Sequence, residues 1–330
     1  MRNTRVGWVC GWLTVAVLIA EIALGSSFGG WLYKSKLTFS GYEGTETLKN
    51  FPALVVLSGD NIAGFDYADC LEGGADIRFT DSEDNEIPYE IESWNSDGES
   101  FLWVRVPELA IAEDCIYLYW GSTGAEAPTY SGEEGVWAGG YEAVWHMNES
   151  DPLDATGNNN DGTGKGGVPV VTAGVVGKAL GFNSTSQDYV DCGNGLRMQK
   201  NDATLSIWYK TANSAASSVM GFLGKSRATS EQRYSMFIEN GILYAMFHGS
   251  SSLLAKTAWS TAYYDNRWHQ LVASYKRDGN LELYIDGESK GTISISAQAN
   301  YDMNSSTLFL SVPTETLQER RLMPASIITA

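Results

Sequence analysis

Hydrophobic and polar residues alternate along many short segments of this chain. In the first half, residues 76–80 (DIRFT), 88–94 and 100–106 (SFLWVRV) alternate, and 53–57 (ALVVL) and 115–120 (CIYLYW) are short, largely apolar runs. The second half repeats the pattern at residues 204–209 (TLSIWY), 235–238, 242–247, 269–275 and 281–285. A period of two, in segments rich in β-branched and aromatic residues, predicts β-strands with one buried face.

Turn residues separate the predicted strands. Asn240-Gly241, Asp278-Gly279 and Asp286-Gly287 lie between strands, where two-residue hairpin turns require positive φ. No convincing amphipathic helix follows residue 30. Many short strands divided in this way predict an all-β protein built from sandwiches or jelly rolls.

The first 25 residues are typical of a secretory signal helix. Arg2 and Arg5 precede an apolar run over residues 8–20, and Ala23 and Gly25 provide small residues before a predicted cleavage site. The alternative is an uncleaved anchor helix; Glu21 argues against it, because a carboxylate in a bilayer is costly. We therefore expect a secreted, periplasmic or cell-surface protein, with no membrane insertion after cleavage of the signal.

Charge divides the chain in two. The 330 residues carry a net charge of −18, which argues against nucleic acid and anionic lipid as partners. Residues 30–150 hold 5 basic and 23 acidic residues, whereas residues 151–330 hold 15 and 16. This contrast predicts two domains, with a Gly- and Glu-rich linker at 127–143. The acidic first domain fits solubility, with divalent-cation-dependent adhesion as the alternative.

Three segments of the second half together resemble the LamG-like jelly roll of the concanavalin A-like lectin/glucanase superfamily: 154–163 (DATGNNNDGT), 174–182 (GVVGKALGF), and 267–273 (RWHQLVA) with 281–287 (LELYIDG). The first half resembles DUF2341, a family without established activity, through 76–81, 88–94, 103–107, 116–121 and 144–149. The resemblances imply a β-sandwich-like domain at 30–126, with the family match running to about 149, and a jelly roll at 144–310. The tail at 311–330 lacks alternation and the family's last strand, which predicts a truncated or frame-shifted reading frame, or else a genuine variant.

The segment 154–163 is a candidate calcium site. Asp154, Asn158, Asn160 and Asp161 offer the hard oxygen ligands that Ca²⁺ prefers, and the resemblance to the jelly-roll family supports calcium at this end of the sandwich. The alternative is a turn rich in Asp and Asn that holds no metal.

Aromatic side chains in predicted loops are candidate sugar platforms, because sugar rings present apolar faces. We expect Trp259, Tyr263, Tyr264 and His248 to line a ligand site. Three further aromatic residues fall within strand patterns and are predicted to lie in the core: Trp208, Trp268 and Tyr284.

No enzyme motif is convincing. Glu282, Asp286 and Glu288 do not fit the E-x-D-x-x-E glucanase spacing, and the three histidines lack metal-ligand spacing. His269 is expected to be a structural hydrogen-bonding residue. In an oxidising compartment Cys70 and Cys115 could form a disulfide, worth about 2–4 kcal/mol.

The sequence thus favours an exported, non-catalytic recognition protein that binds glycan or a surface protein, assisted by calcium. One alternative is a structural or adhesive surface protein without a sugar site. Another is the binding part of a glycan-active enzyme.

Overall fold

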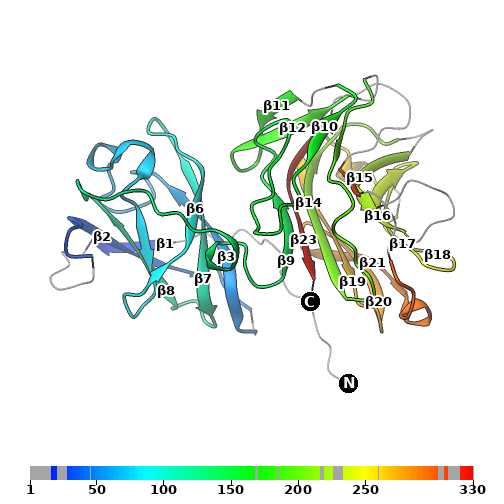
Figure 1. The fold of residues 1–330 in the computed structure, drawn as a ribbon, viewed down its shortest axis with the longest axis horizontal. Coiled ribbons are helices and arrows are strands. Elements are labelled where there is room, and N and C mark those ends of the chain that lie inside the picture. The colour runs from blue at the N-terminus through cyan, green and yellow to red at the C-terminus, as the bar shows by residue number, and fades with distance from the viewer. Residues whose placement is uncertain are drawn as a thin grey trace. The chain divides into compact units, whose positions relative to one another are not determined.

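A computed structural model shows two compact units, residues 1–139 and 140–330, built almost entirely of β-strands (Figure 1). The structure describes residues 16–20, 28–44, 46–167, 170–183, 186–215, 219–225, 233–258, 260–303, 308–310 and 320–329. The all-β prediction is confirmed. Helices among the described residues are single 3₁₀ turns, and none is long and apolar enough to span a membrane: Tyr67–Asp69, Glu72–Gly74, Gly132–Glu134, Thr261–Tyr263 and Ser296–Gln298.

The first unit contains two antiparallel sheets. One has the order β1-β2-β8-β4-β5, and the other has the order β3-β7-β6. Side chains from both sheets form one apolar cluster, as in a sandwich. The strand bounds are β1 Ala16–Ala20, β2 Tyr33–Thr38, β3 Leu48–Leu57, β4 Arg78–Thr80, β5 Glu86–Ile87, β6 Tyr89–Ser93, β7 Ser100–Leu109 and β8 Cys115–Trp120.

The DIRFT segment has a structural role in this unit. The Asp76 carboxylate is fully buried and accepts hydrogen bonds from the backbone N–H groups of Leu71, Gly121 and Ser122, at 2.7, 2.8 and 3.0 Å. Gly121 has a φ of +86°, and a Cβ there would lie 2.5 Å from the Tyr33 ring, so the position requires glycine. The motif therefore ties the end of β8 to the segment before β4.

Most of the predicted signal segment lies outside the described residues. Ala16–Ala20 is described, and it forms strand β1, which pairs antiparallel with β2 rather than forming part of a helix. Backbone pairing with β2 accounts for the extended conformation.

The predicted linker at 127–143 is not a linker. Val136 and Trp137 are buried in the first unit, and Trp137 Nε1 donates a hydrogen bond to Glu90 Oε1 at 2.6 Å. The boundary falls between residues 139 and 140, and β9 (Tyr141–Trp145) is already part of the second unit.

The second unit is a sandwich of two larger antiparallel sheets. Sheet C has the order β11-β12-β23-β14-β19-β20-β21, with β9 also paired to β23, and sheet D has the order β10-β13-β22-β15-β16-β17-β18. The strand bounds in sheet C are β11 Val170–Ala173, β12 Lys178–Phe182, β14 Ala203–Lys210, β19 Trp268–Tyr275, β20 Asn280–Ile285, β21 Glu288–Ser294 and β23 Arg320–Thr329. Those in sheet D are β10 Thr163–Lys165, β13 Tyr189–Asp191, β15 Val219–Lys225, β16 Arg233–Glu239, β17 Ile242–His248, β18 Ser252–Lys256 and β22 Leu308–Leu310.

The tail that was predicted to lack a strand contains β23, which lies inside sheet C. Its backbone pairs with β14 on one side and with β12 and β9 on the other. The register with β14 shifts between Ile207–Ala325 and Trp208–Met323, so Pro324 occupies the irregularity. Proline has no N–H to donate and is tolerated at such an irregularity, so Pro324 does not prevent pairing on either side of it.

Candidate functional site

The strands of sheet C turn one side to the core and the other side outward. On β14, Leu205, Ile207 and Tyr209 are fully buried in the core, so the residues between them lie on the opposite face. The register of β14 with β19 and of β19 with β20 extends this division to the next two strands, although Ser206, Gln270 and Val272 on the opposite side are also buried. We call the opposite side the outer face of sheet C; its residues on these three strands are Thr204, Ser206, Trp208, Lys210, Trp268, Gln270, Val272, Ser274, Glu282 and Tyr284.

Three aromatic side chains predicted to lie in the core belong to this outer face. Trp208, Trp268 and Tyr284 are all half-buried. Trp208 lies directly opposite Gln270, and Tyr284 lies directly opposite Val272. The core prediction is wrong for these residues because large aromatic side chains were taken to be internal, whereas the alternation itself places them outside.

Polar groups lie among these aromatic rings. Gln270 Nε2 donates a hydrogen bond to Ser206 Oγ at 3.3 Å, and Ser289 Oγ of β21 donates one to Glu282 Oε1 at 2.6 Å. Burial and the neighbouring Glu282 carboxylate raise the pKa of Tyr284, so its hydroxyl stays protonated. Gln270 and Ser206 are buried, whereas Thr204, Glu282 and Tyr284 are half-buried, so the accessible part of the outer face combines flat apolar rings with hydroxyl and carboxylate groups.

Among the described ligand residues predicted from loops, His248 and the pair Tyr263 and Tyr264 lie toward opposite ends of β19. Tyr263 is half-buried, packs on the core, and lies 5.8 Å from the His269 ring at the start of β19. His248 is the last residue of β17. Two residues before it, the Met246 carbonyl accepts a hydrogen bond from the hydroxyl of Tyr275, the last residue of β19, so His248 lies near that end of β19. The two ends of β19 are about 20 Å apart. Tyr264 packs on the core beside Tyr263, and Trp259 lies outside the described residues.

His269 is held between two carboxylates. Its Nδ1 is 2.7 Å from Asp286 Oδ2, and its Nε2 is 3.2 Å from Asp265 Oδ1. The hydrogen bond with Asp286 raises the pKa of His269 above 6.5, burial opposes the rise, and Asp265 adds to it. Asp286 Oδ1 also accepts from the Gln270 N–H at 2.9 Å, which links this cluster to the outer face.

The candidate calcium loop is held together by its own hydrogen bonds. The Asp154 carboxylate accepts hydrogen bonds from the N–H groups of Val144, Thr156 and Asn160 at 2.9–3.0 Å, and from the Thr156 hydroxyl at 2.9 Å. Asp161 Oδ1 accepts from the Asp154 N–H at 2.9 Å.

The two asparagines tie this loop to β9. The Asn158 side-chain amide donates to the carbonyls of Tyr141 and Glu142, and the Asn160 amide donates to Glu142. The described part of the chain contains no group of three or more His, Cys, Asp or Glu side chains placed to bind one metal ion. This geometry is that of a turn rich in Asp and Asn, and calcium binding stays a prediction.

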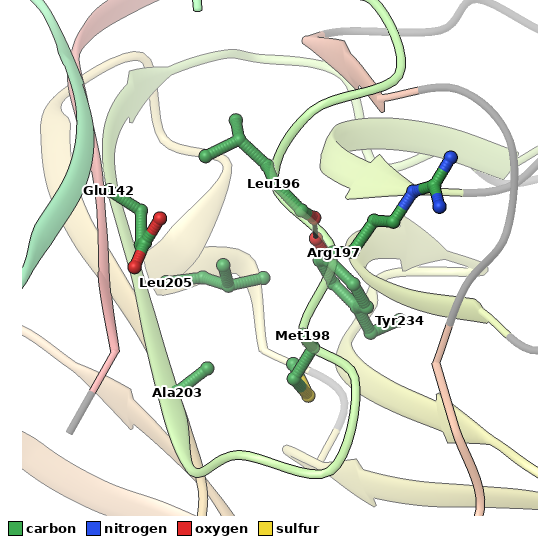
Figure 2. A pocket seen from close by; sticks show the side chains of 7 residues that line it. All are labelled: Glu142, Leu196, Arg197, Met198, Ala203, Leu205 and Tyr234. Atoms are coloured by element: carbon green, nitrogen blue, oxygen red, sulfur yellow. Dashed lines mark hydrogen bonds between the residues drawn. The ribbon is translucent and has the colours of Figure 1, made fainter. Parts of the chain in front are cut away.

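A small cavity lies between β14, β16 and the loop at 196–198 (Figure 2). Its volume is about 10 Å³, room for one water molecule rather than a sugar. Arg197 points its guanidinium away from the Glu142 carboxylate in Figure 2. The residues that line the cavity are Glu142, Leu196, Arg197, Met198, Ala203, Leu205 and Tyr234.

Two buried cations of the second unit have structural roles. Lys225 donates hydrogen bonds to the carbonyls of Asn194, at 3.0 Å, and Gly195, and burial lowers its pKa to about 8. Arg277 donates to four backbone carbonyls from two segments: Gln199, Gln298, Ala299 and Tyr301. Sequence reasoning did not identify either residue, because their partners are carbonyl groups distant in the chain.

The predicted disulfide is not formed. Cys70 and Cys115 both carry free thiols. Burial, followed by the nearby Asp76 carboxylate, raises the pKa of the Cys70 thiol to about 12, which makes it unreactive at neutral pH.

The carboxylates considered for hydrolysis are engaged with neighbouring groups. Asp286 contacts His269 and the Gln270 N–H, Glu282 accepts from Ser289, and Glu288 forms an ion pair with Lys290. Asp286 also has a φ of 51° in the β20–β21 turn, as expected for a hairpin residue.

Comparison with known families confirms both resemblances in the predicted order. Residues 73–136 match the domain of unknown function DUF2341, and residues 183–312 match the concanavalin A-like lectin/glucanases superfamily. No curated protein matches the chain.

Among solved structures, the chain is similar to the binding domain of Paraclostridial Mosquitocidal Protein 1, with 18% identity and a TM-score of 0.48 over 57% of this chain and 48% of that one. It is also similar to the receptor binding domain of botulinum neurotoxin D, with 15% identity and a TM-score of 0.47 over 58% of this chain and 49% of that one. A third similar structure is domain 4 of an extracellular arabinanase from Geobacillus stearothermophilus, in complex with arabinotriose. The identity is 18% and the TM-score 0.46, over 58% of this chain and 93% of that domain. The chain thus spans about half the length of the two toxin domains.

Proposed function

We propose that this chain, in which a DUF2341 region precedes a concanavalin A-like jelly roll, is an exported, non-catalytic protein that binds glycan through the outer face of sheet C. The observation that carries the proposal is the half-buried set of Trp208, Trp268 and Tyr284 on one face. Flat rings stack on the apolar faces of sugars, and half-buried polar side chains of the same face, such as Thr204 and Glu282, can hydrogen-bond with sugar hydroxyls.

The engaged carboxylates support a role without catalysis. A retaining glycosidase needs two carboxyl groups about 5–5.5 Å apart that are available to the sugar. Glu282, Asp286 and Glu288 each serve a hydroxyl, imidazole or ammonium group of the protein itself. Recognition without bond cleavage is the simpler use of this surface.

A glycan array followed by calorimetry tests the proposal. We expect Trp208→Ala and Tyr284→Ala each to weaken glycan binding by tenfold or more, because each removes one stacking ring. The matched control is Tyr244→Ala, which removes a half-buried tyrosine stacked 5.0 Å from Phe237 on strands β17 and β16 of sheet D. It should leave binding unchanged.

Three outcomes would contradict the proposal. If the unaltered protein binds no glycan, the structural or adhesive alternative gains support. If Trp208→Ala and Tyr284→Ala bind glycan as tightly as the unaltered protein while keeping its unfolding temperature, the site lies elsewhere. Release of reducing sugar by the unaltered protein would instead indicate an enzyme.

A further inference from the structure

One corner of the outer face carries a lysine between two tryptophans. Lys210 follows Trp208 by two residues on β14, so their side chains share this face about 7 Å apart along the strand. Trp268 lies directly opposite Lys210 on β19. On the other side, the position opposite Lys210 in β23 is Arg321. We call Trp208, Lys210 and Trp268 the Lys210 corner.

Lys210 differs from neighbouring cations in having no carboxylate partner within the described part of the chain. Arg267, next to Trp268, forms an ion pair with Asp265 at 3.5 Å, and Lys290 forms one with Glu288. Lys210 is also half-buried, so its aliphatic stem is packed against the face while the ammonium group can reach a ligand bound there.

We infer that the Lys210 corner binds the anionic group of an acidic sugar, so that the ligand class of the outer face is a glycan carrying carboxylate or sulfate groups. This inference rests on the proposed function. The sugar ring stacks on Trp208 or Trp268, and the anionic group contacts Lys210 Nζ.

Glu282 is the one carboxylate among these outer-face residues, and it does not cancel the preference of Lys210 for an anionic group. Glu282 is in the same cross-strand row as Thr204, six residues from Lys210 along β14, or about 20 Å. That distance exceeds the Debye length of about 8 Å at physiological ionic strength. An oligosaccharide on this face therefore meets the Lys210 ammonium at one end and the Glu282 carboxylate, a hydrogen-bond acceptor, at the other. This difference sets the orientation in which the oligosaccharide binds.

Matched ligands test the inference. Calorimetry compares a uronic-acid tetramer with its carboxyl-reduced, neutral counterpart, and a sulfated oligosaccharide with its desulfated counterpart. We expect the acidic member of at least one pair to bind about tenfold more tightly, and binding to weaken with salt. The pair that shows the difference identifies carboxylate or sulfate as the recognised group.

Variants of the lysine locate the effect. Lys210→Gln should abolish the tenfold difference between the acidic and the neutral member of the pair, whereas Lys210→Arg should retain it. The control Lys256→Gln removes an exposed lysine from β18 of sheet D and should change nothing. Equal affinity within both pairs, or a difference that survives Lys210→Gln, would overturn the inference and leave glycan binding intact. If no oligosaccharide of either kind binds, the proposed function itself fails.

Discussion

The His269 cluster makes the stability of the second unit depend on pH. Both ring nitrogens face carboxylate oxygens, at 2.7 and 3.2 Å. A neutral imidazole has one N–H, so it can donate to only one of them, whereas the imidazolium donates to both. Loss of the proton therefore turns a lone pair toward one carboxylate and removes an attractive contact.

The size of the effect follows from exposure. The His269 side chain is 12% exposed, but Asp265 is 29% and Asp286 46% exposed, so water screens both contacts. Exposed ion pairs contribute about 0.2–1 kcal/mol each, and burial of the histidine favours the upper part of that range. We expect about 1–2 kcal/mol in total, or about 2–8 °C in unfolding temperature for a unit of this size.

The direction is set by the pKa values. Because the pKa of His269 is raised above 6.5, its contribution is complete below pH 6.5 and disappears as pH rises through the folded-state pKa. For Asp265, burial opposes the change, but hydrogen bonds from Arg267 and His269 lower its pKa below 3.8. The contribution of Asp265 is therefore lost only as pH falls through that lower value. The cluster stabilises most between about pH 4 and 6.5.

Thermal unfolding of the full chain from pH 4 to 9 measures this contribution. The unfolding temperature of His269→Gln should lie below that of the unaltered protein at pH 5–6, and the gap should close toward pH 9. His248→Gln is the matched control with the opposite sign: burial, and then Arg233, lower the pKa of His248, so its removal should relieve destabilisation at acid pH. The reasoning is refuted if the unfolding temperatures of His269→Gln and the unaltered protein do not differ, or if they differ by the same amount at every pH from 4 to 9.

Three further predictions concern the structural groups. Asp154→Ala should lower the free energy of unfolding by about 2–3 kcal/mol in urea titrations, because four donor contacts lose their acceptor; an unchanged midpoint would contradict this. Asp76→Ala should destabilise the first unit by about 3 kcal/mol, measured in the same way, and Asp60→Ala is an exposed control that should have no effect. If the 154–163 segment binds calcium as its sequence predicts, chelator should lower the unfolding temperature measured in calcium, and a value unchanged within about 1 °C would favour a turn that holds no metal.

Alternation predicted the strands well because each strand has one buried face. It also held the information that placed Trp208 and Tyr284 outside, since Leu205, Ile207, Leu281 and Leu283 occupy the inward positions around them. Interpreting tryptophan as a core residue concealed this signal. Sequence alone did not reveal β23, because its place in sheet C depends on backbone pairing with distant strands.

The position of β23 has a consequence for the order in which the second unit folds. Trp145 pairs with Ala325 and Leu180 pairs with Leu322, so the middle of sheet C joins segments from the two ends of the unit. Contacts between such distant segments slow folding, and a ribosome must finish residues 320–329 before they can form. Until then β12, β9 and β14 have an empty space between them. The second unit therefore completes sheet C only after β23 has been synthesised.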